Sequence, residues 1–196
     1  MAMPTKLNLT ILQGSTFSEI IRWEDYKKVY KPITGITQAG PVVITSPTHA
    51  VPDGWRVRVT GVGGMKEINS AETYRKATLL TTNTIEINEI NSSLYTAYTT
   101  GGVLEYNEPM DLAGYTARMQ VRTKIGSTTF LTELTTENGG IVLNNTNKTI
   151  KLLISATNTA LIDWSKGVYS LELISGAGIV YTLLTGNITV KNEVTR

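Results

Sequence analysis

The residues able to perform acid–base or nucleophilic chemistry centre on one histidine. His49 lies in SPTHAVPDGW near Ser46 and Asp53, so this segment holds the three residue types of a Ser-His-Asp set. Residues so close along a Pro-rich loop rarely converge in that geometry, and the sequence has no Gly-x-Ser-x-Gly nucleophile elbow. We therefore expect His49 to stabilise a turn, and we predict no catalytic residue and no enzymatic activity.

Metal binding finds equally little support. The sequence has no cysteine and one histidine, whereas a zinc site needs three or four such ligands. Glu24 and Asp25 are neighbours on an extended segment, so their side chains point to opposite faces. We predict no metal site, although a pair of carboxylates from distant strands, as glycosidases use, stays open.

The glycine-rich stretch VTGVGGMKE, Val59 to Glu67, raises the question of a phosphate-binding loop. Such a loop needs a helix directly after it, because the helix N-terminus directs its N–H groups at the anion. The residues that follow, KEINSAETYRKATLL, favour a turn and another strand, and no Lys-Ser/Thr follows at P-loop spacing. We expect Gly61, Gly63 and Gly64 to adopt positive φ in a loop, and we predict no cofactor.

One segment combines aromatic and basic residues. DYKKVYK interleaves Tyr26 and Tyr30 with Lys27, Lys28 and Lys31. Aromatic rings stack on bases while lysines neutralise phosphates, but the whole chain carries a formal charge of only +2, and the outer row Arg118, Arg122 and Lys124 is not extended by neighbouring strands. We therefore interpret the segment as a solvated, hairpin-like connection and as the candidate docking surface. We do not expect nucleic-acid binding.

Composition indicates a folded all-β protein. The 196 residues are 41% hydrophobic and 17% charged, which is enough to bury a core under a surface of Thr, Asn, Ser and Gly. The N-terminal stretch lacks the pattern of a secretory signal, and no apolar run approaches the roughly 20 residues that span a bilayer. We expect no membrane association.

Period-2 alternation predicts most of the elements. In YTARMQVRT, the residues Ala117, Met119 and Val121 alternate with polar ones, and TIKLLIS, VYSLELIS, IVYTLLTG and ITVKNEV behave in the same way. The exception is SATNTALIDWSKG, where Ser155 or Thr157 as N-cap and Gly167 as stop predict one short helix.

The chain is predicted to form two domains. LNLTILQGSTFSEIIRWED is typical of two strands around a Gln13-Gly14-Ser15 turn, and these strands need partners from the chain after residue 107. We predict an immunoglobulin-like β-sandwich from residues 1–33 and 107–196, with one short helix. Residues 34–106 are predicted to form an inserted small β-barrel-like domain.

These segments resemble a known family. LTILQGSTFSEIIRWED, PMDLAGYTARMQVR and above all ISATNTALIDWSKGVYSLEL are similar to the small β-sandwich domain of tailed-phage virion proteins, found at the N-terminus of baseplate and receptor-binding components. ITGITQAGPVVITSPTHAVPDGWRVRVTGVGGMKEIN through YTAYTTGGVLEY is similar to a small β-module that recurs in phage tail proteins. In relatives of the first type, the interruption at 33–107 is often missing.

The resemblance implies a structural protein of a virion, made in the host cytoplasm. We expect a tail, baseplate or fibre-attachment component that docks other virion proteins and forms a homo-oligomer in a symmetric assembly. A glycan-binding or hydrolytic tail module and a head-decoration or collar protein are the alternatives. Besides DYKKVYK, the ends MAMPTK and VKNEVTR are candidate docking segments.

Overall fold

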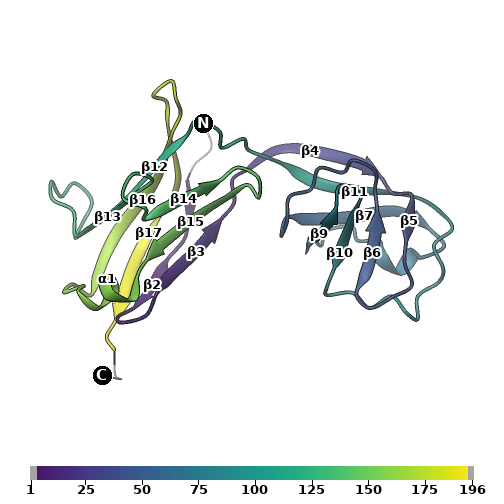
Figure 1. Ribbon diagram of the computed structural model, residues 1–196, viewed down its shortest axis with the longest axis horizontal. Coiled ribbons are helices and arrows are strands. Elements are labelled where there is room, and N and C mark those ends of the chain that lie inside the picture. The colour runs from purple at the N-terminus through teal and green to yellow at the C-terminus, as the bar shows by residue number, and fades with distance from the viewer. Residues whose placement is uncertain (1–3, 194–196) are drawn as a thin grey trace. The chain divides into compact units, whose positions relative to one another are not determined.

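The computed structural model describes residues 4–193, and its strands run from β1 to β17 with one short α-helix and one 3-10 turn (Figure 1). The predicted all-β class is confirmed. The chain divides into two compact units: unit 1 comprises the residues up to Trp23 and from Asp111 onward, and unit 2 is Glu24–Met110. Within the described residues, no helix has the length and apolar character required to cross a membrane.

Unit 1 consists of two sheets around one core. The larger sheet has the spatial order β1 (Thr5–Lys6), β17 (Val180–Lys191), β16 (Lys166–Ile174), β12 (Thr116–Arg122) and β13 (Thr132–Thr135). A further strand, β2 (Leu9–Leu12), also pairs with β17. The smaller sheet contains β14 (Ile141–Asn144), β15 (Thr149–Ile154) and β3 (Phe17–Ile21). Met119 and Leu171 of the first sheet pack in the same core as Ile150 and Leu152 of the second, so unit 1 is a β-sandwich.

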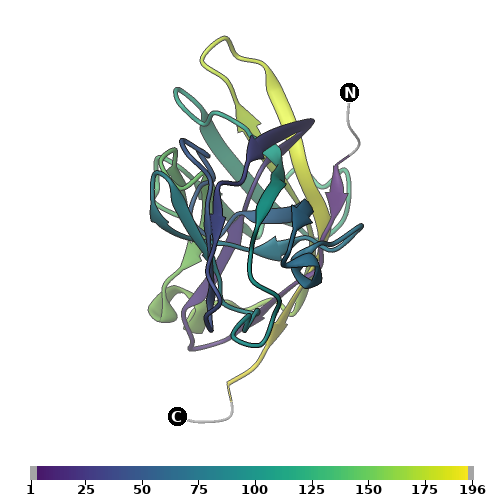
Figure 2. The ribbon, with the colours of Figure 1, turned by 90° about the vertical axis from the view of Figure 1, so that its right-hand side faces the viewer.

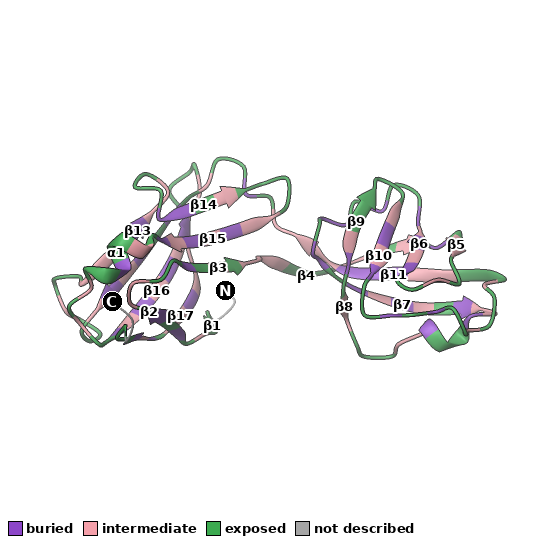
Figure 3. Cartoon of the chain, turned by 60° about the horizontal axis from the view of Figure 1, so that its bottom comes forward, coloured by how far each residue is buried: buried purple, intermediate pink, exposed green. Residues whose placement is uncertain are grey.

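The alternation in the sequence matches the burial in unit 1. Ala117, Met119 and Val121 are buried along β12. Figure 3 shows the same alternation of buried and more exposed residues along β15 and β16. As predicted, the strands on either side of the Gln13-Gly14-Ser15 turn pair with the later chain, β2 with β17 and β3 with β15. The turn therefore carries the chain from one sheet to the other.

The helix is shorter than its predicted span. α1 (Ala156–Ala160) begins at the N-cap Ser155, whose side chain accepts from the N–H of Asn158 at 3.2 Å. It ends well before the predicted stop Gly167, which lies inside β16. A Cβ at Gly167 would lie 2.7 Å from the Val121 side chain, so this glycine permits close packing of two strands and does not terminate the helix.

The two predicted C-terminal strands are one continuous strand. β17 runs through Gly186 without a break and can be followed as the long yellow strand in Figure 2. The glycine allows the backbone of Leu7 to approach, because a Cβ at this position would lie 1.9 Å from the carbonyl oxygen of Leu7. Gly186 thus allows two segments of the chain to approach closely inside a sheet.

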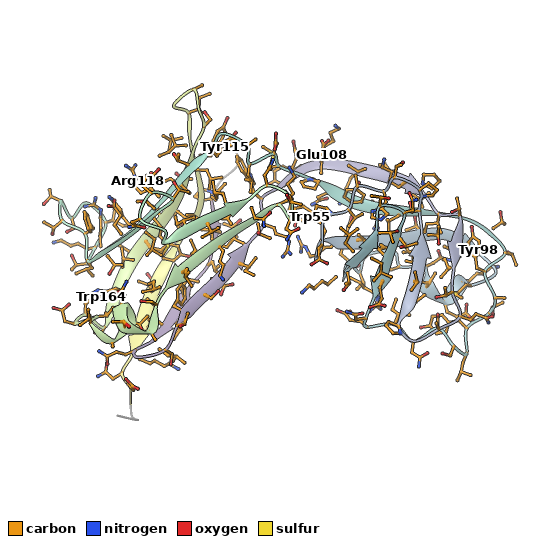
Figure 4. All side chains as sticks on the ribbon, in the orientation of Figure 1. Trp55, Tyr98, Glu108, Tyr115, Arg118 and Trp164 are labelled. Carbon is orange, nitrogen blue, oxygen red and sulfur yellow. The ribbon has the colours of Figure 1, made fainter. Side chains whose placement is uncertain are left out.

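Unit 2 has its own core between two four-stranded sheets. One sheet contains β4 (Glu24–Pro32), β11 (Thr100–Pro109), β7 (Arg56–Gly63) and β8 (Arg75–Lys76). The other contains β5 (Gly35–Ile36), β6 (Val42–Thr45), β10 (Thr84–Ile87) and β9 (Thr78–Thr81). Trp55, labelled in Figure 4, packs in this core with Ile44, Ile85 and Tyr106, whereas Trp164 packs against the core of unit 1.

The boundary of unit 2 lies before the predicted residue 34. Residues 24–32, which we expected to belong to the sandwich, form β4 and pair with β11 from Tyr30↔Glu105 to Lys28↔Asn107 and beyond. The ladder continues past residue 107 to Pro109. The inserted unit is therefore longer at both ends than the predicted range 34–106. The predicted connection DYKKVYK is a strand.

The glycine-rich stretch ends β7. Gly61 and Gly64 adopt φ of 70° and 76°, but Gly63 does not have positive φ. A 3-10 turn, η1 (Lys66–Ile68), follows, where we expected a turn leading directly to a strand. A Cβ at Gly64 would lie 2.2 Å from the carbonyl oxygen of Ala97, so Gly64 serves a close approach of two loops.

Excision of unit 2 is expected to leave a folded unit 1. Glu24 and Pro109 are partners at the end of the β4–β11 ladder, so the two cut ends of unit 1 are close. A short Gly/Ser linker can therefore join Trp23 to Asp111 at a cost of about 0.6 kcal/mol per doubling of its length. Cooperative denaturant unfolding, followed by the fluorescence of Trp23 and Trp164, checks this result. The cut from Ile33 to Asn107 retains β4 without most of β11 and is expected to aggregate.

Candidate docking surface

The five residues predicted to form a docking surface lie on β4 but on two faces. Side chains alternate along the regular part of a strand, so Lys28 and Tyr30 share one face while Lys31 lies on the other. The register of β4 with β11 shifts between Lys28 and Glu24, so Tyr26 and Lys27 lie where the alternation is interrupted. Tyr30 is opposite Glu105 of β11, and Lys28 is opposite Asn107. The structure therefore brings Tyr30 and Lys28 together on one face and places Lys31 on the other.

A buried carboxylate holds several side chains in place on the face that carries Tyr30. Glu105 is 4% exposed, and its carboxylate accepts from Tyr74 Oη at 2.5 Å and Arg58 Nη2 at 2.5 Å and lies 3.4 Å from Lys28 Nζ. Burial alone would raise the pKa of Glu105, but the hydrogen bonds from Tyr74 and Arg58 outweigh it and lower that pKa. Glu105 is therefore ionised at neutral pH and holds two cations in place.

The cations in this cluster also contact the ring of Tyr74. Lys28 Nζ lies 4.6 Å and Arg58 Cζ 5.5 Å from its centroid, within the range of cation–π contacts. The hydrogen bond to Tyr74 raises the pKa of Lys28. The ammonium group of Lys28 is thus engaged by Tyr74 and Glu105 and is less available to a partner than we expected from the sequence.

Tyr26 and Tyr30 are the accessible aromatic residues of β4. They are 84% and 62% exposed. Lys27 forms an exposed ion pair with Glu108 at 2.8 Å, which contributes little in water. A partner of β4 would therefore meet two exposed tyrosine rings on a strand that also carries Lys28 of the Glu105 cluster.

β4 is also an edge strand. Among the described residues, it forms a ladder with β11 only, so its other edge presents N–H and C=O groups without strand partners. Exposed edges invite strand addition, and lysines and prolines limit uncontrolled pairing. Lys27, Lys31 and Pro32 fit that protective role.

Sequence reasoning missed Arg58, Tyr74 and Glu105. They come from β7, the segment before β8, and β11, and nothing in their local patterns indicates that they meet. The predicted docking ends are described only in part: residues 1–3 and 194–196 lie outside the described range, while Lys6 lies in β1 and Lys191 ends β17.

His49 has a structural position in the core of unit 2. Its side chain is fully buried, and Nδ1 accepts from the N–H of Val51 at 2.9 Å. The proton must then reside on Nε2, which donates to the carbonyl oxygen of Thr81 at 3.1 Å. The imidazole therefore fixes two loops as a neutral group. Among residues 4–193, no group of three or more His, Cys, Asp or Glu side chains gathers to hold a metal ion.

Unit 2 is expected to lose stability in mild acid through His49. Burial, aided by the charge of Lys31, lowers the pKa of His49 below its ordinary 6.5. The unfolded chain then binds the proton more readily, so the contribution of His49 is complete above about pH 6.5 and is lost as the pH falls towards the folded-state pKa. We expect the free energy of unfolding of unit 2 to decline from about pH 6.5 towards 5 in the wild type but not in His49→Gln. Parallel pH profiles of the two proteins would contradict this assignment.

No protein-family model matches the sequence, and no curated protein matches it.

Proposed function

We propose that the protein is a structural component of a tailed-phage virion, in the tail, baseplate or fibre-attachment region, and that it acts by docking other virion proteins. The observation that carries the docking role is the exposed edge of β4 with Tyr26 and Tyr30 beside it. The sequence resemblance to phage β-sandwich domains supports the virion context. Symmetric repetition in a ring or trimer would multiply this modest interface into a stable attachment.

The exposed side chains of β4 are of the kinds that interfaces use. Tyrosine supplies a large contact area at a low entropic cost, and tyrosine and arginine are enriched where interfaces are strongest. Glu105 holds Lys28 and Arg58 in place, so a partner would meet a preorganised surface.

The test is incorporation into particles of a phage that carries this protein. We expect Tyr26→Ser with Tyr30→Ser to reduce the copies per purified particle, measured by quantitative mass spectrometry, while the variant folds normally. The matched control is Leu80→Ser with Leu94→Ser, which removes two exposed apolar side chains of the same unit. Normal incorporation of the tyrosine variant would reject β4 as the docking surface, and absence from the particles of both the variant and the wild type would reject the virion proposal.

A glycan-binding role is the second candidate, because exposed tyrosine rings are also suited to sugar faces. Binding of the purified protein to host polysaccharide that is lost in the double tyrosine variant would favour this role over protein docking. A head-decoration or collar position is distinguished by cross-linking mass spectrometry on intact particles.

A further inference from the structure

A groove lies across the outer face of the larger sheet in unit 1. Its volume is about 510 Å³, within the range of sites that hold ligands. Its floor is a row of polar side chains in register on four strands: Lys6 of β1 is opposite Thr185, Thr185 is opposite Ser170, and Ser170 is opposite Gln120. Arg122, Val168 and Asn187 form the next row.

The groove is cationic. Lys6, Arg122 and Lys124 line it, and no Asp or Glu does so in the described part of the chain. Arg122 is anchored by neutral acceptors, the carbonyl oxygen of Ser127 and Gln120 Oε1, the latter at 2.7 Å. Glu133 lies opposite Gln120 on β13, and its carboxylate accepts from the amide of Gln120 at 2.6 Å. The guanidinium charge thus has a fixed position and, among residues 4–193, no direct carboxylate partner.

The direction of the groove limits what can bind there. It crosses β16 and β17, which are already paired on both sides, so an occupant gains no main-chain ladder and must be recognised through side chains. Tyr169 is 4% exposed and offers no ring face on which a base or a sugar could stack. Ile125, by contrast, is 90% exposed at the rim.

We propose that this groove binds an extended acidic peptide segment of a neighbouring protein, through two carboxylates and an intervening apolar side chain. The row from Lys6 to Gln120 spans three strand spacings, roughly 14 Å, and carboxylates four residues apart on an extended chain lie roughly 13 Å apart. The hydroxyl groups of Ser170 and Thr185 bind the peptide amides between them, while Gln120 holds Arg122 in place. The partner class rests on the proposed docking function, but the binding itself is measured on the purified protein alone.

The experiment is fluorescence anisotropy with a short labelled peptide carrying two glutamates at that spacing and a leucine between them. A peptide with both glutamates replaced by glutamine is the ligand control. The protein variant is Lys6→Gln with Lys124→Gln. Lys166→Gln with Lys191→Gln removes the same charge from unit 1 outside the groove. Arg122 stays unchanged because it also holds the loop at Ser127.

We expect the groove variant to bind the acidic peptide about tenfold more weakly than the wild type, the control variant to bind like the wild type, and binding to weaken with salt. No binding of the acidic peptide, equal losses in the two variants, or equal binding of the glutamine peptide would overturn the proposal. Tighter binding of an oligogalacturonate or a single-stranded oligonucleotide would also overturn it, in favour of an acidic glycan or a nucleic acid. Peptide binding by a protein that is absent from virions would reject only the proposed function.

Discussion

Replacing Trp55 by alanine is expected to unfold unit 2 selectively. Trp55 is 1% exposed in the core of unit 2, and its indole N–H donates to the carbonyl oxygen of Asn107 at 2.9 Å. Truncation removes the largest fully buried side chain and leaves a cavity, which costs about 4 kcal/mol. That is a large part of the stability of a unit of this size.

The other two tryptophans make this measurement specific. Trp23 and Trp164 both belong to unit 1, so in Trp55→Ala the fluorescence transition reports unit 1 alone, while hydrogen exchange of the amides of β6 and β10 reports unit 2. We expect loss of protection in unit 2 and an unchanged fluorescence midpoint. Trp55→Phe, which keeps most of the volume, is expected to cost much less. An equal shift of both probes would mean that the two units unfold together.

Replacing Gly186 by alanine is expected to destabilise unit 1 by about 3 kcal/mol, because the added methyl group meets backbone that cannot yield. The Cβ would lie 1.9 Å from the carbonyl oxygen of Leu7. That oxygen accepts from Tyr169 Oη at 2.7 Å, and the N–H of Leu7 donates to the carbonyl oxygen of Thr185 at 2.9 Å. Moving Leu7 away therefore breaks both hydrogen bonds.

Gly176→Ala is the matched control for this prediction. The nearest atom to its Cβ would be the carbonyl oxygen of Gly114 at 3.6 Å, an ordinary contact, so its effect should stay within about 0.5 kcal/mol. Denaturant unfolding followed by tryptophan fluorescence measures both variants. If Gly186→Ala unfolds at the same midpoint as Gly176→Ala, the pairing of Leu7 with β17 contributes nothing to the stability of unit 1.

The sequence by itself determined the class of the fold and many of its local features. Alternation at Ala117, Met119 and Val121 identified a strand and its buried face, because side chains of a strand alternate with period 2. Ser155 identified the start of the helix, because its hydroxyl caps a local N–H group. The lone His49 was expected to stabilise a turn, and its bond to the N–H of Val51 is of that local kind.

Only the tertiary structure decided which strands are neighbours and in what register. DYKKVYK contains charged residues at both parities, so its pattern does not distinguish a solvated connection from an edge strand, and the ladder with β11 settles its place in unit 2. The cluster around Glu105 and the row from Lys6 to Gln120 combine residues far apart in the chain. Periodicity determines the face on which a side chain lies, but the partner across a sheet depends on long-range pairing, which leaves no mark in the local sequence.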